Sequence, residues 1–477
     1  KYMINNGYNV GNFSSFISLN HDRTDGHRAD SKFDITNGFL NLGYKIDDHY
    51  KVTGDLSLAK YNTEDPGTIT SPLLDHVMHI LRGTTSFALE NHHEKSSGAL
   101  RVFYNWGHHK INDGHAPNAD PRSFLFYSDD HNTGIQLYQS FRLVEGNTFT
   151  AGVDYKNWGG HAWNDTIKGA IGEVVDKSVH EVAGYAIMQQ DLFDILSLNA
   201  GVRYEHSSAY GGEWVPQAGF ALRPFEGNTI KGSFSKGYRS PTLRELYISY
   251  LPYSKANPDL KPELNYSMQL TYIIKNKYVL GAFANFQPDK IQQMSYQQPD
   301  RLQSVFHSIN LDTHTMYGLM AVVPFRAGEV LSSRLTLMVF SIHDKGTLVD
   351  INFDRKKLFG RAMLTNTIFL TRDKNLSLDI SGDYSSPAIQ GIYDIDPLYS
   401  LDAALVWTLP KKRLRLTLKG SDLLNSQKPL THIDEQRQKS RMELFQDIRS
   451  VSLTLRYSFG GYKEKKVKSV DTSRFGT

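Results

Sequence analysis

Imidazole and carboxylate side chains gather in one stretch of this chain and could contact a metal or a metal chelate. The candidates are His108, His109, Asp113, His115 and His131. Both groups can ligate a transition metal, and imidazole can ligate the iron of haem. No spacing within the stretch fixes a coordination geometry, so the sequence names no metal. A polar surface loop at 108–131 is the alternative, because the chain holds 18 histidines.

Aromatic rings and arginines form a second candidate group. Its members are Trp158, His161, Trp163, Tyr238, Arg239, Arg244, Tyr247, Tyr250 and Tyr253. Rings and guanidinium groups bind an anionic, aromatic ferric chelate by stacking and by charge-assisted hydrogen bonds. Aromatic residues are also typical of the girdles that membrane barrels place at the two lipid–water interfaces. Ligand contact and girdle therefore remain two open interpretations.

The chain carries no signature of bond-making chemistry. It has no nucleophile elbow, no phosphate loop and no His-Glu-x-x-His motif. Its formal net charge of +3 is too balanced to favour nucleic acid as a partner. We therefore expect a protein that is not an enzyme, with no catalytic residue, no cofactor and no nucleic-acid partner.

The elements that must position these groups alternate between apolar and polar side chains. From Val451 to Phe459, Val, Leu, Leu, Tyr and Phe share one face, and Ser, Thr, Arg and Ser share the other. The same period of two recurs at 196–204, 376–381 and 414–419. A strand of this kind needs apolar contact on one side and water on the other. Repeated along the whole chain, the pattern predicts an all-β fold, a transmembrane antiparallel β-barrel.

Turn residues divide the chain into twenty predicted strands, among them single strands at 8–21, 277–297 and 302–325. Short turns alternate with long loops such as 62–80 and 239–262, which is typical of bacterial outer-membrane barrels with their long loops outside the cell. An even number of strands puts both termini on one side. The predicted location is the bacterial outer membrane, with extracellular long loops and periplasmic turns and termini.

The composition agrees with a barrel and argues against spanning helices. Only 40% of the residues are hydrophobic and the mean hydropathy is −0.43, as expected when half of each strand faces water. One of the longest uncharged apolar runs, Gly318–Phe325, falls far short of the ~18 residues that a spanning helix needs. The chain has no cysteine, and a closed barrel needs no disulfide because its backbone groups are all paired.

Two short boxes flank the loop at 239–262. The first is Tyr238-Arg239-Ser240-Pro241, and the second is Asn257-Pro258-Asp259-Leu260-Lys261-Pro262-Glu263. The pair resembles the paired boxes of TonB-dependent outer-membrane receptors, although Ser240 stands where that family usually has Ala. The resemblance is carried by Tyr238, Arg239, Pro241, Asn257, Pro258, Leu260, Pro262 and Glu263. The boxes could contact the ligand directly, or they could only shape the loop, since proline restricts the backbone around it.

The resemblance implies a barrel of twenty-two strands that holds an N-terminal plug with a TonB box. Eleven predicted strands precede the boxes, where the family has thirteen. Residues 1–460 are therefore expected to be a barrel without its plug and first hairpin, followed by a short basic periplasmic tail at 461–477. The implied partners are the TonB energising complex, acting through the plug, and outer-membrane lipid. A surface lipoprotein is a further candidate.

The resemblance also implies energised uptake of a scarce metal chelate that binds on the extracellular loops. We expect a ferric siderophore first, and cobalamin or haem after it. Haem ranks lower because haem receptors of the family carry a His between the boxes, whereas this chain has Tyr247, Tyr250 and Tyr253 there. A passive porin-like channel and a barrel that binds a partner protein or a glycan are the alternatives.

Overall fold

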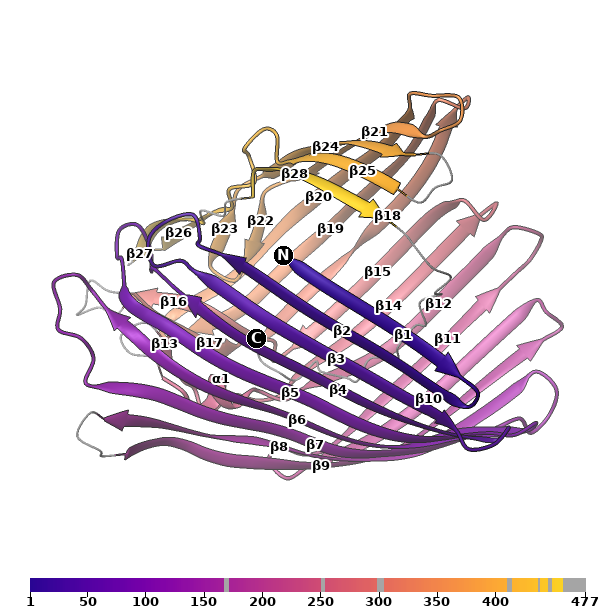
Figure 1. Ribbon diagram of the computed structural model, residues 1–477, viewed down its shortest axis with the longest axis horizontal. Helices are drawn as coiled ribbons and strands as arrows, with labels where there is room; N and C mark the ends of the chain where they lie inside the picture. The colour runs from indigo at the N-terminus through magenta and orange to yellow at the C-terminus, as the bar shows by residue number, and fades with distance from the viewer. Residues whose placement is uncertain are drawn as a thin grey trace. The chain divides into compact units, whose positions relative to one another are not determined.

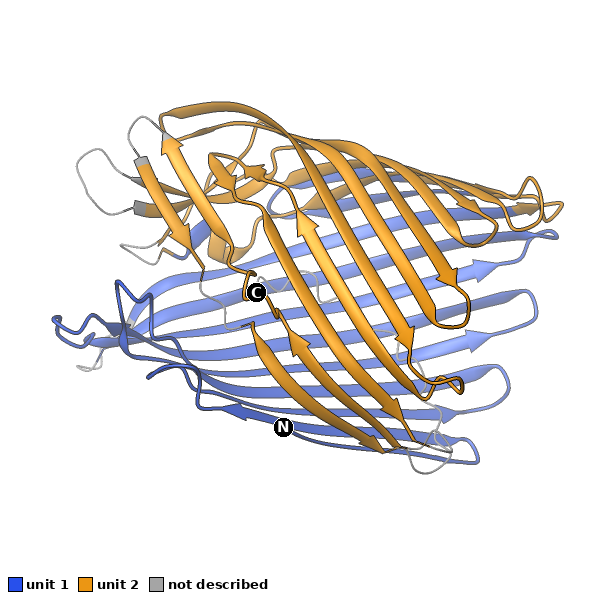
Figure 2. Ribbon diagram, turned by 90° about the horizontal axis from the view of Figure 1, so that it is seen from above, with its two compact units in different colours: residues 1–190, 199–216, 246–248 blue, residues 191–198, 217–245, 249–477 orange. Residues whose placement is uncertain are grey.

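The computed structural model describes residues 1–166, 171–249, 254–297, 304–409, 414–435, 438–444 and 448–457. Strands dominate these residues, and one short helix, α1 (Leu243–Tyr247), accompanies them (Figure 1). No helix of the described residues has the length and apolar character needed to cross a membrane. The chain divides into two compact units (Figure 2). Unit 1 comprises 1–190, 199–216 and 246–248, and unit 2 comprises 191–198, 217–245 and 249–477.

In unit 1 each strand pairs antiparallel with the next from β1 to β9. The strands are β1 (Tyr2–Val10), β2 (Phe13–Thr24), β3 (Phe33–Lys45), β4 (Tyr50–Glu64), β5 (Leu74–His92), β6 (Ser96–His115), β7 (Phe124–Phe141), β8 (Asn147–Thr166) and β9 (Ile171–Leu192). The boundaries between the units fall at the end of β9 and within β10 (Leu196–Ser207) and β11 (Gly211–Leu222).

In unit 2 the same antiparallel order continues through the long strands. They are β12 (Thr229–Arg239), β14 (Glu263–Ile274), β15 (Tyr278–Pro288), β18 (Thr313–Ala327), β19 (Leu331–Leu348), β20 (Ile351–Phe369), β21 (Leu376–Ser385), β24 (Leu398–Thr408), β25 (Leu414–Ser421) and β28 (Ser450–Tyr457). Two small sheets are built from the long connections. One contains β13 (Ser254–Lys255), β16 (Ile291–Gln297) and β17 (Ser304–Asn310), and the other contains β22 (Ala388–Gln390), β23 (Tyr393–Ile395), β26 (Leu430–Glu435) and β27 (Gln438–Glu443).

Within each unit, most short connections lie at one end of the long strands and the long connections lie at the other. In unit 1 the short ones are 11–12, 46–49, 93–95 and 142–146, and in unit 2 they include 275–277, 328–330 and 370–375. We call these the turn end. The opposite loop end carries 240–262, 289–312, 386–397 and 422–449 in unit 2. The predicted alternation of short turns and long loops therefore holds for most connections, whereas 208–210 and 349–350 are short although they lie at the loop end.

The two faces of the long strands carry different side chains, because successive residues of a strand point to opposite faces. On one face of β6 and β7, Val102 and Ile135 are cross-strand partners that are 41% and 46% exposed. On the opposite face Asn105 and Asn132 are partners, and both are buried. The polar face also holds Arg203, whose guanidinium lies 2.5 Å from Asp154. We call these the apolar face and the polar face. Together they confirm the predicted all-β antiparallel architecture.

The structure corrects the predicted strands in three places. The predicted strand at 8–21 is a hairpin of β1 and β2, and its turn holds Gly11 at a φ of +52°. The sequence of β1 is rich in Asn and Gly, which indicate turns when read alone, but pairing with β2 prevails. The predicted strands at 277–297 and 302–325 are each divided, into β15 and β16 and into β17 and β18.

These corrections change the strand count and the position of the first residue. Twenty-one described strands belong to the large antiparallel sheet, and twelve of them precede the boxes instead of the predicted eleven. Because β1 runs from the loop end to the turn end, Lys1 lies at the loop end, whereas both termini were predicted at the turn end. The predicted tail at 461–477 lies outside the described residues.

Neighbouring positions on β7 offer a test of the two faces. Ile135 lies on the apolar face between Val102 and Tyr155, and Gln136 lies on the polar face between Arg101 and Asp154. Arginine in the hydrocarbon of a barrel costs about 2–4 kcal/mol near the midplane. We expect Ile135→Arg to lower the free energy of unfolding in lipid vesicles by about that amount and Gln136→Arg to change it by less than half as much. Guanidinium titration followed by tryptophan fluorescence measures both, and equal losses would contradict the assignment of faces.

Candidate functional site

The loop that joins β12 to β14 begins with a capped turn of helix. The Thr242 hydroxyl accepts the backbone N–H of Glu245 at 3.2 Å, and the Glu245 carboxylate accepts the backbone N–H of Thr242 at 2.8 Å. This reciprocal arrangement is a capping box, which satisfies two backbone donors that the start of a helix leaves unpaired. It fixes α1 at the loop end of β12.

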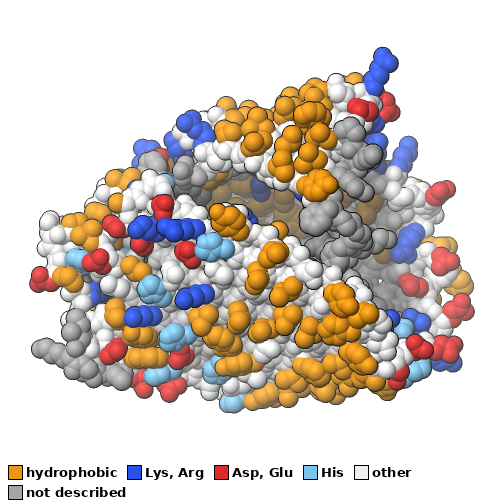
Figure 3. Space-filling view, in the orientation of Figure 1, with side chains coloured by type: hydrophobic (Ala, Val, Ile, Leu, Met, Phe, Trp, Pro, Cys, Tyr) orange, Lys and Arg blue, Asp and Glu red, His pale blue; other side chains and the backbone are white. Residues whose placement is uncertain are grey.

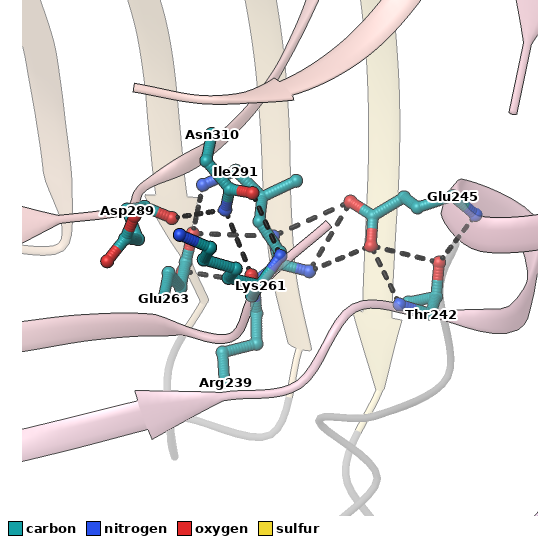
Figure 4. Close-up of polar contacts among 8 residues, drawn as sticks. All are labelled: Arg239, Thr242, Glu245, Lys261, Glu263, Asp289, Ile291 and Asn310. Carbon is teal, nitrogen blue, oxygen red and sulfur yellow. Dashed lines mark hydrogen bonds and ion pairs between the residues drawn. The ribbon is translucent and has the colours of Figure 1, made fainter. Parts of the chain in front are cut away.

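Arg239 joins the two boxes (Figure 4). Its guanidinium lies 3.1 Å from Oε2 of Glu245 and 3.0 Å from Oε1 of Glu263. Glu245 belongs to α1 and Glu263 begins β14, so one side chain bridges both sides of the long loop. Charge-assisted hydrogen bonds of this kind are stronger than neutral ones. The donors of Arg239 are used inside the protein, which indicates that this residue positions the loop.

The second box is fixed to the β16–β17 hairpin. Glu263 accepts the backbone N–H of Ile291 at 2.8 Å. The Asn310 amide donates to the carbonyl of Lys261 at 2.9 Å and to that of Asp289 at 2.7 Å, and its oxygen accepts the N–H of Lys261 (Figure 4). Asn257, at the start of the box, donates to the carbonyl of Ser308 at 2.9 Å. The box therefore shapes the loop through contacts that are mostly with backbone atoms.

The long connections of unit 2 enclose a small apolar core of their own. Met294, Leu311 and Leu348 are fully buried in it. Its other members are Tyr296, Phe353, Ile392, Tyr393 and Ile433. The Tyr393 hydroxyl accepts the backbone N–H of Ser295 at 2.5 Å. A core of this kind holds long loops in one arrangement, because opening it would expose the apolar side chains to water.

Buried charges lie beside this core. His314 and Asp344 form an ion pair in which both side chains are buried, and Asp344 also accepts the backbone N–H of Gly391 at 2.6 Å. Burial lowers the pKa of the Lys290 ammonium, while the carboxylates of Asp344 and Glu263 act in the opposite direction. A buried charge is tolerated only where partners surround it. These contacts therefore tie β18, β19 and the β22–β23 connection together.

A hollow of about 470 Å³ opens on unit 2 beside the middle of β20 and the loop-end halves of β21 and β24. Arg361 contacts Asp383 in it, with a guanidinium nitrogen 2.8 Å from the carboxylate. The remaining lining is rich in hydroxyl groups, from Thr365, Ser381, Ser385 and Ser400, and also contains Phe359, Met363, Gly382, Leu398, Tyr399, Asp402 and Gln427. The hollow combines one cation, carboxylates and hydroxyl donors, which suits a polar, oxygen-rich ligand.

The predicted histidine stretch is not a single loop and its members do not converge. Residues up to 115 belong to β6, residues from 124 belong to β7, and the connection is 116–123. His109 lies on the polar face, where its Nε2 is 3.2 Å from Asp130, and Arg82 donates to the same carboxylate at 2.8 Å. Asp113 and His115 lie further toward the loop end, with His76 and Leu74 as partners across the strands.

Four predicted residues lie on the apolar face but nearer to the loop end than its apolar side chains: His108, His131, His161 and Trp163. His108 is 2.6 Å from Asp129. His161 stacks on Trp163 at 4.6 Å between ring centroids, and Trp163 stacks on Tyr127 at 5.5 Å. His131 is 2.9 Å from the Asn157 amide oxygen on the same face. Adjacent residues such as His108 and His109 cannot share a ligand here, because strand neighbours point to opposite faces.

The remaining predicted residues are scattered. Trp158 lies on the polar face, where Asn132 is its cross-strand partner. Tyr238 and Phe234 share one face of β12, and Arg239 lies on the other face. Arg244 and Tyr247 are exposed on α1. Tyr250 and Tyr253 lie outside the described residues. Among the described residues, no three His, Cys, Asp or Glu side chains are grouped so that they could hold a metal ion.

Some residues of the site escaped the sequence analysis although a signal for them existed. Thr242-Leu243-Arg244-Glu245 has the Thr-x-x-Glu spacing of a capping box, which predicts the start of α1. Asp344 and Gly391 are 47 residues apart, and no local sequence pattern predicts their contact. Arg361 and Asp383 likewise meet only because β20 and β21 pair.

The chain is similar to known outer-membrane proteins in sequence and in fold. Residues 178–457 match the outer membrane protein beta-barrel family. The siderophore receptor PirA from Pseudomonas aeruginosa is 13% identical, with a TM-score of 0.66 over 92% of this chain and 74% of that one. The FrpB iron transporter from Neisseria meningitidis is 13% identical, with a TM-score of 0.68 over 96% and 79%. The copper transporter OprC is 12% identical, with a TM-score of 0.69 over 94% and 75%. At these identities the structural likeness concerns the fold alone.

The bridge made by Arg239 can be tested through the order of its loop. Arg239→Ala removes hydrogen bonds to two carboxylates, and bonds to charged groups contribute about 1.5–3 kcal/mol each. We expect amide hydrogen exchange in 240–262 to become at least tenfold faster. Lys261→Ala is the matched control, because only its backbone takes part in the network. Unchanged exchange in Arg239→Ala, or equal acceleration in both variants, would contradict the positioning role.

Proposed function

Because the chain belongs to the outer membrane protein beta-barrel family and has the barrel fold of TonB-dependent receptors, we propose that it forms the barrel of a receptor that imports a metal chelate. The family resemblance found in the sequence is thereby confirmed at the level of the fold. Family and fold place the protein in the bacterial outer membrane. The cargo and its energised transport are our proposal.

The main support for the proposal is that contacts within the protein hold the connections at the loop end of unit 2 in a defined arrangement. A passive channel needs loops that leave its lumen open, whereas a receptor needs loops with a defined shape to select its ligand. Here Arg239 bridges the two boxes, Asn310 clamps the second box, and eight buried residues form a separate core among the connections. This arrangement supports a receptor whose binding surface is preformed.

The hollow at Arg361 and Asp383 is the cargo contact that we favour. It lies beside the middle of β20 and the loop-end halves of β21 and β24, and it offers a guanidinium group beside hydroxyl donors. Ferric siderophores present anionic oxygen atoms to such groups, which charge-assisted hydrogen bonds recognise. The similar proteins are a siderophore receptor, an iron transporter and a copper transporter. We therefore place a ferric siderophore first and cobalamin or haem after it.

Arg244 on α1 belongs to unit 2, as the hollow does, is exposed, and is a further residue that we propose for cargo contact. Tyr247 and His109 belong to unit 1 and are left out of this site. Arg239 is assigned to positioning because its donors meet Glu245 and Glu263. His108, His161 and Trp163 lie on the apolar face and are left out of the proposed cargo site.

Transport itself is proposed to depend on partners. The TonB energising complex would act through a plug that carries a TonB box, and the barrel would make and break no bonds. The proposal is therefore a transport receptor and not an enzyme. A surface lipoprotein remains a candidate partner for the long connections.

A glycan is the second candidate ligand, and the same hollow favours it. Hydroxyl groups from Thr365, Ser381 and Ser400 beside an Arg–Asp pair can exchange hydrogen bonds with sugar hydroxyls. A ferric chelate depends on the positive charge of Arg361, whereas a neutral sugar depends on both donors and acceptors. The two candidates therefore respond differently to loss of that charge.

Tryptophan fluorescence quenching of the intact receptor in detergent tests the proposal. The titrants are a ferric catecholate, a ferric hydroxamate, haemin, cyanocobalamin and a neutral oligosaccharide. We expect saturable submicromolar binding of one ferric siderophore and at least tenfold weaker binding by Arg361→Ala, equivalent to about 1.4 kcal/mol. Arg372→Ala is the control, because Arg372 is exposed in the turn-end connection 370–375 and does not line the hollow.

The outcomes separate the candidates. Saturation by the oligosaccharide alone would favour the glycan receptor, and binding of none of the five would contradict both proposals. Equal weakening by Arg361→Ala and Arg372→Ala would move the cargo site away from the hollow while leaving the receptor function intact.

A further inference from the structure

Three cations follow one another on the polar face of β20. Arg355, Lys357 and Arg361 are separated by even numbers of residues, so they share this face, and Phe359 lies between the last two. They extend from near the loop end of the strand to its middle, where Arg361 lines the hollow. Because a strand advances about 3.4 Å per residue, the row is roughly 20 Å long. We call these three residues the cation row.

The opposite face of β20 carries a different pattern. Lys356 lies there near the loop end, and Leu358 and Leu364, which are 69% and 39% exposed, follow it along the strand. On the apolar face of unit 1, apolar side chains likewise spread over the strands, and charged side chains and histidines gather toward the strand ends (Figure 3). The cation row is therefore a feature of the polar face, because its charges continue to the middle of the strand.

A carboxylate of the same chain occupies the loop-end part of the cation row. Asp394 on β23 lies 2.5 Å from a guanidinium nitrogen of Arg355 and 3.5 Å from the ammonium of Lys357. One carboxylate thus serves two cations, and its contact with Lys357 is the longer one. Guanidinium and ammonium groups bind oxyanions through charge-assisted hydrogen bonds. The position of Asp394 therefore shows which kind of group these two cations accept.

The connection that carries Asp394 has other anchors. Within 386–397, Tyr393 is buried in the small apolar core, the backbone N–H of Gly391 donates to Asp344 at 2.6 Å, and β23 pairs with β26. The Asp394 side chain, in contrast, is 38% exposed. An ion pair this exposed adds little to stability. The carboxylate can therefore turn away from β20 while the connection stays in place.

Arg355 keeps its position without Asp394. Its guanidinium also donates to the carbonyl of Gly391 at 3.3 Å. Its cross-strand partner Asp344 is already bound to His314 and to the N–H of Gly391. The contact with a neutral carbonyl orients the guanidinium without cancelling its charge. A side chain that is already oriented loses little conformational entropy when it binds a ligand.

We propose that Arg355 and Lys357 form an entry subsite for an anionic chelate and that Asp394 is its exchangeable internal occupant. This inference rests on the proposed receptor function, and it adds a contact about 13 Å nearer to the loop end than Arg361. Oxyanion groups of the arriving ligand replace the carboxylate of Asp394 on the two cations. The ligand then passes Phe359 to reach Arg361 in the hollow. One anion replaces another, and no covalent bond changes.

Equilibrium binding to the intact receptor in detergent tests the subsite. The probe is an anionic ferric tricatecholate. We expect Lys357→Gln to weaken its binding about fivefold, and Asp394→Asn to strengthen it about threefold because the internal competitor is removed. Lys356→Gln and Asp354→Asn are the matched controls, since they remove the same charges from the opposite face of β20 and should leave the affinity unchanged.

Acetylation of Lys357 provides a readout that does not depend on the cargo. Brief treatment with acetic anhydride, followed by mass spectrometry of the peptides, compares the reactivity of individual lysine amines. We expect Lys357 to react about threefold faster in Asp394→Asn than in wild type, because the carboxylate no longer holds its ammonium. Millimolar citrate, a tricarboxylate without iron, should slow this reaction relative to chloride at equal ionic strength. Lys356 should show neither change.

The two readouts separate the subsite from the receptor function. Protection of Lys357 by citrate, in a wild type that binds no ferric chelate, would support the subsite and overturn the receptor proposal. Equal affinity of wild type, Lys357→Gln and Asp394→Asn for the chelate would overturn the subsite and leave the receptor. Acetylation of Lys357 that responds neither to Asp394→Asn nor to citrate would also overturn the subsite. Resistance to dodecyl sulfate before heating checks that each variant has folded.

Discussion

The structure depends on the register between neighbouring strands. Each strand must pair its backbone groups and also turn apolar side chains to one face and polar side chains to the other. The pairing of β6 with β7 sets Leu100 against Leu137 and Val102 against Ile135, while Asn105 meets Asn132 on the other face. A slip of one residue would exchange the two faces. The strength of this constraint explains why even the Asn-rich β1 is held as a strand.

The same constraint decides which residues can act together at the loop end. A strand delivers every second side chain to one face, so a binding site must be assembled from several strands or from the connections between them. Unit 2 uses its connections in this way. The capping box of α1, the bridge made by Arg239 and the clamp made by Asn310 fix one long connection, and the core around Met294 fixes the others. Many hydrogen-bonding groups of the paired boxes therefore hold this connection in place.

The sequence was sufficient to predict which segments form strands and which side chains share a face. It was not sufficient to predict which residues of different strands meet. The alternation from Val451 onward correctly predicted β28, and the paired boxes correctly indicated the fold. The histidine stretch was misread as one loop because polar residues continue far along β6 and β7, beyond the apolar zone. The His314–Asp344 pair and the Arg361–Asp383 pair join strands whose register cannot be deduced from either segment alone.

A cysteine scan along β6 tests the central claim most directly, because the natural chain has no cysteine. Single cysteines from 100 to 108 would carry a spin label in lipid bilayers, and collision with oxygen and with a water-soluble nickel complex would be measured. The account predicts high oxygen accessibility at 100, 102 and 104, low values at 101, 103 and 105, and a change to nickel accessibility at 108. A profile without a period of two, or with its oxygen maxima at 101, 103 and 105, would contradict the assignment of the apolar face to lipid.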